Sequence, residues 1–209
     1  MNKYVVVTAL AILGACSHTV LVPVPPRVDL QGYGTLGIVE FGSNSERAIS
    51  ARATRQFQEQ IQAAQPGTRF IDLGDRQALL ASLGVKQLDP AAMRKIREKY
   101  GVGAVFLGDI AYSQPRVDVN IGDLTKLEGG MRAEMKGELS AQLLETASGA
   151  SVWSSSGWVR RPLGSVSLSA EHGVSGGMRN SDPREEMVPA LVREVTQDFR
   201  PSTVRQPAN

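Results

Sequence analysis

The hydrophobic positions of this chain follow two different periods, and the change between them divides the sequence. Before residue 100, apolar residues recur every three or four positions in several stretches, whereas after residue 116 they alternate with polar residues. Between the two regions, residues 103–112 (GAVFLGDIAY) form a nearly continuous apolar run of strand length. Such a run is typical of a strand that is buried on both faces, so we expect it to be the central strand of a sheet.

The first half predicts alternating strands and helices. In residues 46–64, Ile49, Phe57 and Ile61 lie on one face of an amphipathic helix that ends before a Pro-Gly pair. Asp89 and Pro90 are typical of a helix N-cap and first helical residue. The expected order is strand, helix, strand, two helices and the central strand, over residues 36–41, 46–64, 68–73, 75–83, 89–100 and 103–112.

The second half predicts antiparallel strands. Residues 117–121 and 131–143 alternate apolar and polar side chains, as a sheet with one buried face requires. A Ser-Gly turn at 148–149 should return the chain as a partner strand over 151–159. Residues 163–181 are rich in Gly and Ser and are expected to form a mobile loop, with room for a minor strand at 165–169.

The last helix should begin near Val188, because Pro189 would break the interior of a longer helix. It should end before Pro201, and residues 202–209 are expected to fray.

The N-terminus has the pattern of a secretory signal. Lys3 precedes an apolar run of ten residues (4–13), whereas a helix that crosses a bilayer needs about 20. Leu13-Gly14-Ala15-Cys16 resembles the bacterial lipobox, in which the cysteine is acylated and the signal is cut before it. Cys16 is the only cysteine, and a lone free thiol is unusual in an exported chain. The alternative is a chance cysteine within an ordinary signal.

The lipobox resemblance implies a lipid anchor at Cys16. Lipoproteins retained in the inner membrane usually have Asp at the next position, where this chain has Ser17. The resemblance therefore also implies sorting to the outer membrane, with the domain facing the periplasm. Without residues 1–15, 194 of the 209 residues remain, which suits a single domain. Residues 16–31 contain three prolines and should be an extended tether with a reach of about 50 Å. Residues 32–200 are then the α/β domain and 201–209 a flexible tail.

Composition and motifs give no support for catalysis. The net charge of +2 supports no attraction to nucleic acid, and His18 and His172 lack metal-ligand spacing. The glycine spacing at 32–37 matches a dinucleotide-binding loop, but a strand-like run follows where that loop needs a helix. We therefore expect no enzyme, cofactor, metal or small-molecule substrate. The alternative is an envelope enzyme, which would require a deep cleft with paired carboxylates or His172.

Two tryptophans suggest a binding surface. Trp153 and Trp158 differ by five positions, so on one strand they face opposite ways and only one can lie in the core. The other is a candidate anchor for a partner, together with Arg160 and Arg161, since aromatic and Arg side chains dominate interface hot spots. The alternative is that Trp158 covers the sheet edge and that both arginines are only solvated.

The order of elements resembles that of a group of bacterial envelope proteins that includes the curli-secretion lipoprotein CsgG, the penicillin-binding-protein activator LpoB and the N-terminal domain of TolB. The matching stretches are residues 36–41 (LGIVEF), 71–80 (IDLGDRQALL), 103–108 (GAVFLG) and 143–153 (LLETASGASVW). The resemblance implies a single α/β domain with a mixed sheet. It also implies a non-catalytic accessory of envelope assembly or secretion that binds an envelope protein or its own copies.

A second reading of this resemblance is a subunit of a CsgG-like oligomeric secretion channel. Strands that cross a membrane need about 9 to 11 alternating residues. The two candidate inserts, 115–130 and 163–180, alternate only over 117–121 and 166–170. We therefore expect the domain to stay outside the bilayer except for its acyl chains, with a partner close to the outer membrane.

Overall fold

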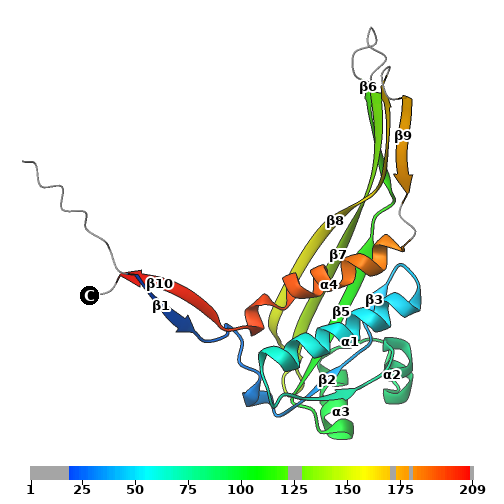
Figure 1. Cartoon of the computed structure of the whole chain (residues 1–209). Helices are drawn as coiled ribbons and strands as arrows, with labels where there is room; N and C mark the ends of the chain where they lie inside the picture. The colour runs from blue at the N-terminus through cyan, green and yellow to red at the C-terminus, as the bar shows by residue number, and fades with distance from the viewer. Residues whose placement is uncertain (1–18, 122–128, 170–172, 179–180, 208–209) are drawn as a thin grey trace, which may run out of the picture.

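The computed structural model describes residues 19–121, 129–169, 173–178 and 181–207. They form one mixed β-sheet with helices packed on it and a separate two-stranded ribbon (Figure 1). The strand order of the large sheet is β4-β2-β5-β7-β8-β9, where β4 is Arg69–Asp72. In addition, β3 (Gly42–Ser43) pairs with β5, and β6 pairs with β7. β5 (Ala104–Tyr112) runs parallel to β2 (Thr35–Ile38) and antiparallel to β7 (Gly129–Glu145). The predicted central strand is confirmed, as is the single α/β fold.

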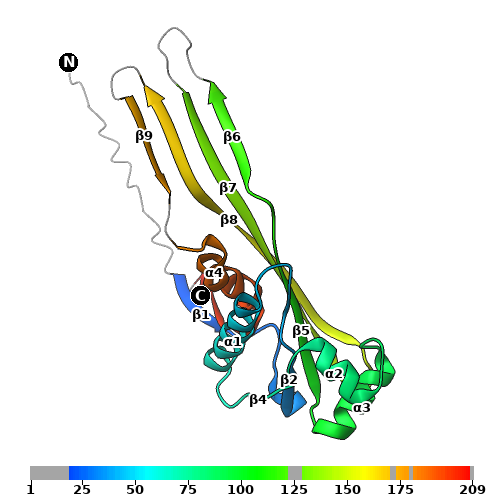
Figure 2. The same cartoon turned by 90° about the vertical axis from the view of Figure 1, so that its right-hand side faces the viewer.

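The helices cover the sheet from both sides. α1 (Arg47–Ala64) and α4 (Pro183–Val195) pack on one face. There Phe106 of β5 contacts four other aromatic rings at 5.1 to 6.0 Å between centroids, those of Phe57, Phe70, Trp153 and Phe199. α2 (Arg76–Leu83) and α3 (Pro90–Tyr100) pack on the other face over Val105 and Leu107. Figure 2 shows α2 and α3 beside the lower end of β5, away from α1 and α4.

The helices predicted over 46–64, 75–83 and 89–100 are confirmed as α1, α2 and α3. Asp75 and Asp89 cap α2 and α3, each accepting a hydrogen bond from a backbone N–H three residues on at 2.8 Å. Both helices end at a glycine in the left-handed conformation, which only glycine adopts without strain. The glycines at 32–37 do not form a dinucleotide-binding loop of the expected geometry. The third glycine, Gly37, lies inside β2, and the next helix begins only at Arg47.

α4 begins earlier than predicted. Asp182 caps it, Pro183 occupies its first turn, and Pro189 lies inside the helix. The proline removes one backbone donor, yet the helix continues because it buries an apolar stripe that extends on both sides of Pro189. The buried members of this stripe are Met187, Val188, Leu191, Val192 and Val195.

A four-stranded arm extends from the sheet (Figures 1 and 2). β7 has 17 residues and β8 (Ser151–Ser169) has 19, so both continue past the helices, with β6 (Arg116–Ile121) and β9 (Gly173–Met178) on the outer sides. The expectation of a mobile loop is therefore wrong for residues 163–169 and 173–178, whereas the minor strand expected at 165–169 is confirmed as the end of β8; residues 170–172 and 179–180 lie outside the described residues. Apart from the short alternation that begins at Val166, the Gly and Ser residues give no strand pattern, and backbone pairing with β7 and β9 forms the strands.

The arm also changes the estimate of strand length in the two inserts. β6 and β9 have six residues each, but they pair with the longer ends of β7 and β8. The alternating stretch predicted from residue 166 belongs to the 19-residue β8. Val117, Val119 and Met131 on one face of the arm are about half exposed, at 54%, 61% and 48%. That the domain stays outside the bilayer remains a prediction.

The segments expected to be a tether and a fraying tail pair with each other. β1 (Thr19–Val24) and β10 (Ser202–Pro207) form an antiparallel ribbon that projects from the body in Figure 1. The prediction of an extended chain is right, but the prediction that it is unpacked is wrong. Neither strand carries a local signal for its partner, which lies about 180 residues away in the sequence. Leu30, also within the expected tether, is buried in the core at 1% exposure.

Candidate functional site

The predicted site residues fall on different parts of the molecule. Cys16, His18 and His172 lie outside the described residues. Trp153 is buried in the core at 7% exposure, whereas Trp158 is 57% exposed. The prediction that only one of the two tryptophans lies in the core is confirmed.

Trp158 lies on the sheet face that α2 and α3 cover over part of β5, in a region over β7 and β8 that the described helices leave uncovered. In this region, between Lys136 and Gln142 of β7 and between Ser154 and Arg160 of β8, the side chains that point away from α1 and α4 are polar and solvent-accessible, as is Asp109 beside them on β5. We call this surface the open face. Its members are Asp109, Lys136, Glu138, Ser140, Gln142, Ser154, Ser156, Trp158 and Arg160.

Two cations hold the Trp158 ring in place. The guanidinium carbon of Arg160 lies 5.3 Å and the Lys136 ammonium 5.7 Å from the ring centroid. The strand register explains this arrangement, because Lys136 pairs with Arg160 and Glu138 pairs with Trp158 across β7 and β8. Lys136 also binds Glu138 at 2.9 Å. An exposed cation–π contact contributes about 0.5 to 1 kcal/mol, which limits the rotation of the ring without covering it.

Arg161 lies on the other face. It forms an ion pair with Glu186 of α4, and its side chain is 35% exposed. The structure therefore brings Trp158 and Arg160 together and separates Arg161 from them, as strict strand alternation would have predicted. Lys136 and Glu138 were missed because only the cross-strand register, counted from the hairpin turn, places them beside Trp158.

A shallow groove of about 440 Å³ continues from Trp158 along the open face. Its lining combines three serines of β8 (Ser154, Ser155 and Ser156) with Ser140 and Gln142 of β7. At the far end, Asp109 forms an ion pair with Arg76 at 3.1 Å. Small hydroxyl side chains leave the space open and offer both donors and acceptors.

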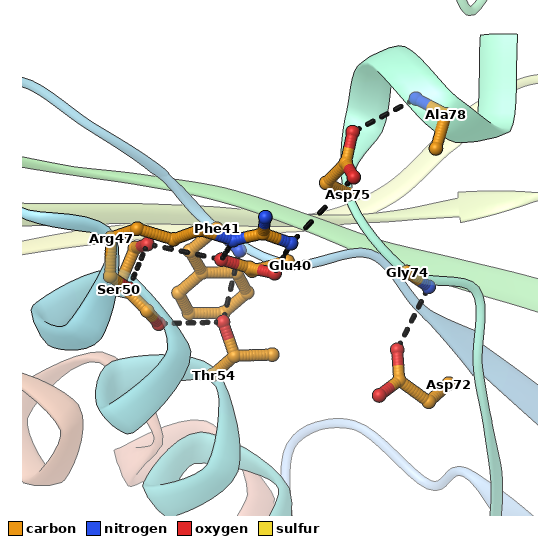
Figure 3. Close-up of polar contacts among 9 residues, drawn as sticks. All are labelled: Glu40, Phe41, Arg47, Ser50, Thr54, Asp72, Gly74, Asp75 and Ala78. Carbon is orange, nitrogen blue, oxygen red and sulfur yellow. Dashed lines mark hydrogen bonds and ion pairs between the residues drawn. The ribbon is translucent and has the colours of Figure 1, made fainter. Parts of the chain in front are cut away.

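A polar cluster lies at the carboxyl ends of β2 and β4 (Arg69–Asp72), the position where α/β sheets often bind ligands (Figure 3). Arg47, from the first turn of α1, binds Glu40 through two nitrogens at 3.1 and 3.2 Å and reaches Asp75 at 3.6 Å. The hydrogen bonds that the Arg47 guanidinium donates to the Glu40 carboxylate raise the pKa of the guanidinium. The hollow beside these residues measures about 480 Å³.

The contacts of this cluster fasten three elements together. Phe41 N–H, just past the end of β2, donates to Thr54 Oγ1 of α1 at 2.9 Å, and Glu40 N–H donates to Gly74 O at 2.9 Å. Ser50 Oγ lies 3.3 Å from the Glu40 carboxylate. Arg47 binds the carboxylates of both Glu40 and Asp75, so the same cation stabilises both. The two carboxylates of an acid/base pair instead lie in two different environments. The geometry thus suits a structural cluster.

Tyr112 and Asp182 are two further groups whose pKa is shifted from its ordinary value. Burial is the main cause of the raised pKa of the Tyr112 phenol, whose hydroxyl donates to Arg184 O at 3.1 Å. Hydrogen bonds from Arg184 lower the pKa of Asp182. Within the described ranges, no three His, Cys, Asp or Glu side chains are gathered as metal ligands would be.

No protein-family model and no curated protein matches the sequence. Among solved structures, the chain is similar to a PelC dodecamer from Paraburkholderia phytofirmans, with 12% identity, coverage of 87% of this chain and 97% of that one, and a TM-score of 0.40. It is also similar to lipoprotein GNA1162 from Neisseria meningitidis, with 14% identity, 76% and 95% coverage, and a TM-score of 0.38.

The C-terminal domain of LpoB from Escherichia coli is a third similar structure, with 17% identity, 63% and 87% coverage, and a TM-score of 0.35. At these values the three similarities concern coarse architecture and carry nothing about activity or partners. The resemblance to CsgG and TolB stays a prediction. Of the helices in the described residues, none combines the length and the hydropathy needed to cross a bilayer.

Proposed function

We propose that this protein is a lipoprotein of the bacterial envelope that works without catalysis, by binding another envelope protein through the open face. Cys16 would anchor it in the outer membrane with the domain toward the periplasm. The lipobox-like Leu13-Gly14-Ala15-Cys16 and the signal pattern before it support the anchor.

The exposure of Trp158 carries the binding part of the proposal. A tryptophan can bury about 150 to 250 Å² of surface, and this one leaves 57% exposed on a flat sheet face. Its ring is already oriented by Arg160 and Lys136, so a partner would lose little side-chain entropy on contact. Trp and Arg are the residue types most enriched in interface hot spots. The adjoining serine-lined groove supplies hydrogen-bonding groups around the aromatic anchor.

The test is site-specific photo-crosslinking in the native envelope. A photo-reactive side chain at Ser156, which lies on the open face beside Trp158, should capture one envelope protein as a discrete adduct. The matched position is Glu59, an exposed residue of α1, where no such adduct should form. Adding Trp158→Ala to the Ser156 probe should reduce the adduct at least about tenfold, because hot-spot residues contribute about 2 kcal/mol or more.

Three results would count against this function. The adduct could form equally at Glu59, it could persist unchanged with Trp158→Ala, or it could fail to form at Ser156 in a chain that is exported and folded. Arg161→Ala is a further control, since Arg161 lies on the opposite face and its loss should leave the Ser156 adduct intact.

A further inference from the structure

The β1–β10 ribbon is a second exposed surface that the protein-binding proposal does not use. Val20, Val22 and Val24 share one face of β1, and Val204 lies on the same face, opposite Val22. Val20 is 53% and Val204 47% exposed. On the other face, Leu21 is 60% exposed and pairs with Arg205. An isolated two-stranded ribbon is marginally stable in water, so an apolar one needs a further surface to pack on.

The ribbon is held at a fixed place on the body. The backbone N–H groups of Arg27 and Val28 both donate to Asp198 O, at 2.9 and 3.3 Å. Arg27 also binds the Asp198 carboxylate at 3.2 Å, and Trp153 Nε1 donates to the same carboxylate at 3.1 Å. The base of the ribbon is thereby connected to the core of the domain, so a surface that binds the ribbon also orients the domain.

The short length of chain between Cys16 and the ribbon indicates that the surface on which the ribbon packs is the membrane. Three residue steps separate Cys16 from Thr19, and a fully extended chain spans about 3.6 Å per residue, or about 11 Å in all. The headgroup layer of a bilayer is about 5 to 8 Å thick on each side. If Cys16 is acylated, the start of β1 must therefore lie within or directly above the headgroups.

The charge of the ribbon fits the same surface. The ribbon strands, 19–24 and 202–207, contain Arg205 and no Asp or Glu. Two more arginines lie at the base of the ribbon, where Arg27 pairs with Asp198 and Arg200 donates to Gln60 and Thr196. Aliphatic side chains together with Arg are typical of segments that lie at the membrane interface, where the guanidinium meets lipid phosphate and the apolar groups enter the acyl boundary. Basic residues are attracted to anionic lipids over about one Debye length.

We propose that the β1–β10 ribbon lies in the headgroup region of the membrane that carries Cys16, with its valine face toward the acyl chains. The ribbon then acts as a second, reversible membrane contact that fixes the direction of the open face. The inference rests on the proposed lipid anchor for its location. The apolar face and the basic residues of the ribbon are independent of that anchor.

The first experiment places a fluorophore on the acylated protein. Because acylation consumes Cys16, a single introduced thiol at Val204→Cys can be labelled and the protein reconstituted in vesicles of phosphatidylethanolamine and phosphatidylglycerol. Nitroxide lipids labelled just below the headgroup should quench this fluorophore strongly. The matched label at Lys99→Cys, on an exposed position of α3, should be quenched little. Equal quenching at both positions, or none at 204, would overturn the proposal.

The second experiment removes the acyl chains and keeps the ribbon. The chain from residue 16 onward with Cys16→Ala, exported behind a signal that is cleaved without lipidation, should float weakly with vesicles that contain phosphatidylglycerol. Arg205→Gln should weaken binding about fivefold, and Val20→Ser with Val204→Ser on the order of tenfold. Val117→Ser is the control, since Val117 on the arm is exposed to the same degree, 54%, and its loss should change nothing.

The outcomes separate this proposal from the proposed function. Mass spectrometry that finds no acyl group on Cys16 would refute the anchor, while vesicle binding by the Cys16→Ala chain would still support the ribbon. Absence of any vesicle binding, or a dimer in lipid-free solution that the Val20 and Val204 changes dissociate, would overturn the ribbon proposal. The Ser156 adduct is unaffected by either result.

Discussion

Trp153 Nε1 donates a hydrogen bond of 3.1 Å to the carboxylate of Asp198, and this contact joins the buried face of β8 to the C-terminal turn Gln197–Phe199. Asp198 also accepts the backbone N–H groups at the base of the ribbon through its carbonyl oxygen. One residue therefore connects the aromatic core, the last helical turn and the segment that leads into β1.

Asp198→Ala should destabilise the domain by about 1 to 3 kcal/mol, because the Trp153 N–H and the Arg27 guanidinium lose their acceptor. Equilibrium unfolding in urea, followed by tryptophan fluorescence, measures the change. Asp198→Asn retains one carbonyl oxygen and should cost less. An unfolding midpoint unchanged by Asp198→Ala would show that the carboxylate does not hold the two segments together.

The two tryptophans should differ sharply in their effect on stability. Trp153→Ala removes a ring packed between Phe106 and Phe199 and should cost about 3 to 5 kcal/mol. Trp158→Ala removes an exposed ring and two cation–π contacts and should cost less than about 1 kcal/mol. Urea unfolding of both variants tests this. A large loss for Trp158→Ala would mean that the ring supports the fold, which would weaken the case for a binding role.

The sequence predicts those parts of the fold that carry local signals. The α1 stripe, the Asp89 cap of α3 and the apolar run of β5 each form where their own residues place them. The ribbon could not be predicted, because Val22 pairs with Val204 and nothing near either residue indicates the other. The continuation of β8 past residue 159 was predicted only as a minor strand at 165–169, because the local alternation there is short and the length of β8 depends on its pairing with β7.

The candidate site shows the same division. The alternation of residues along one strand predicts that one tryptophan faces solvent, and it separates Arg160 from Arg161. The contribution of Lys136 depends on the register between two strands, which a bulge between Ala133 and Glu134 and another near Leu144 both alter. Local periodicity gives the face of a residue, but only the pairing gives its neighbours.

Thr54 should be important for stability although it lies in the middle of a helix. Its hydroxyl accepts the Phe41 N–H at 2.9 Å and donates to Ser50 O at 2.8 Å, and the side chain is nearly buried. Thr54→Val keeps the shape and leaves the Phe41 N–H without an acceptor, which should cost about 1 to 3 kcal/mol. Thr54→Ser keeps the hydroxyl and should restore most of this stability in urea unfolding. Equal losses for the two variants would instead indicate packing of the methyl group.

Asp182 should make stability depend on pH at the acidic end. Arg184 lowers the pKa of Asp182 in the folded protein, whereas an unfolded Asp titrates near about 3.9. Between the two values the unfolded chain binds more protons, so this contribution is present above the unfolded pKa and is lost as the pH falls through the folded one. Urea unfolding from about pH 6 down to about pH 2 should show the loss.

Asp182→Asn should remove that part of the pH dependence, since the amide does not titrate and can still cap α4. Arg184→Gln is the matched variant, because it keeps the carboxylate and removes the cation that shifts it. If the acid dependence of wild type and both variants were the same, Asp182 would not be its source.

Cys16→Ala should release the domain from the membrane without unfolding it. The variant needs residues 1–15 replaced by a secretory signal that is cleaved without lipidation, because the lipobox pathway acts on the cysteine itself. Two or three acyl chains, at about 0.8 kcal/mol per buried methylene, bind far more strongly than a short ribbon with three exposed aliphatic side chains. After a high-salt wash, which screens the ribbon arginines, the variant should therefore appear in the soluble periplasmic fraction with a wild-type unfolding midpoint. Its retention in the membrane fraction after that wash would refute the lipid anchor.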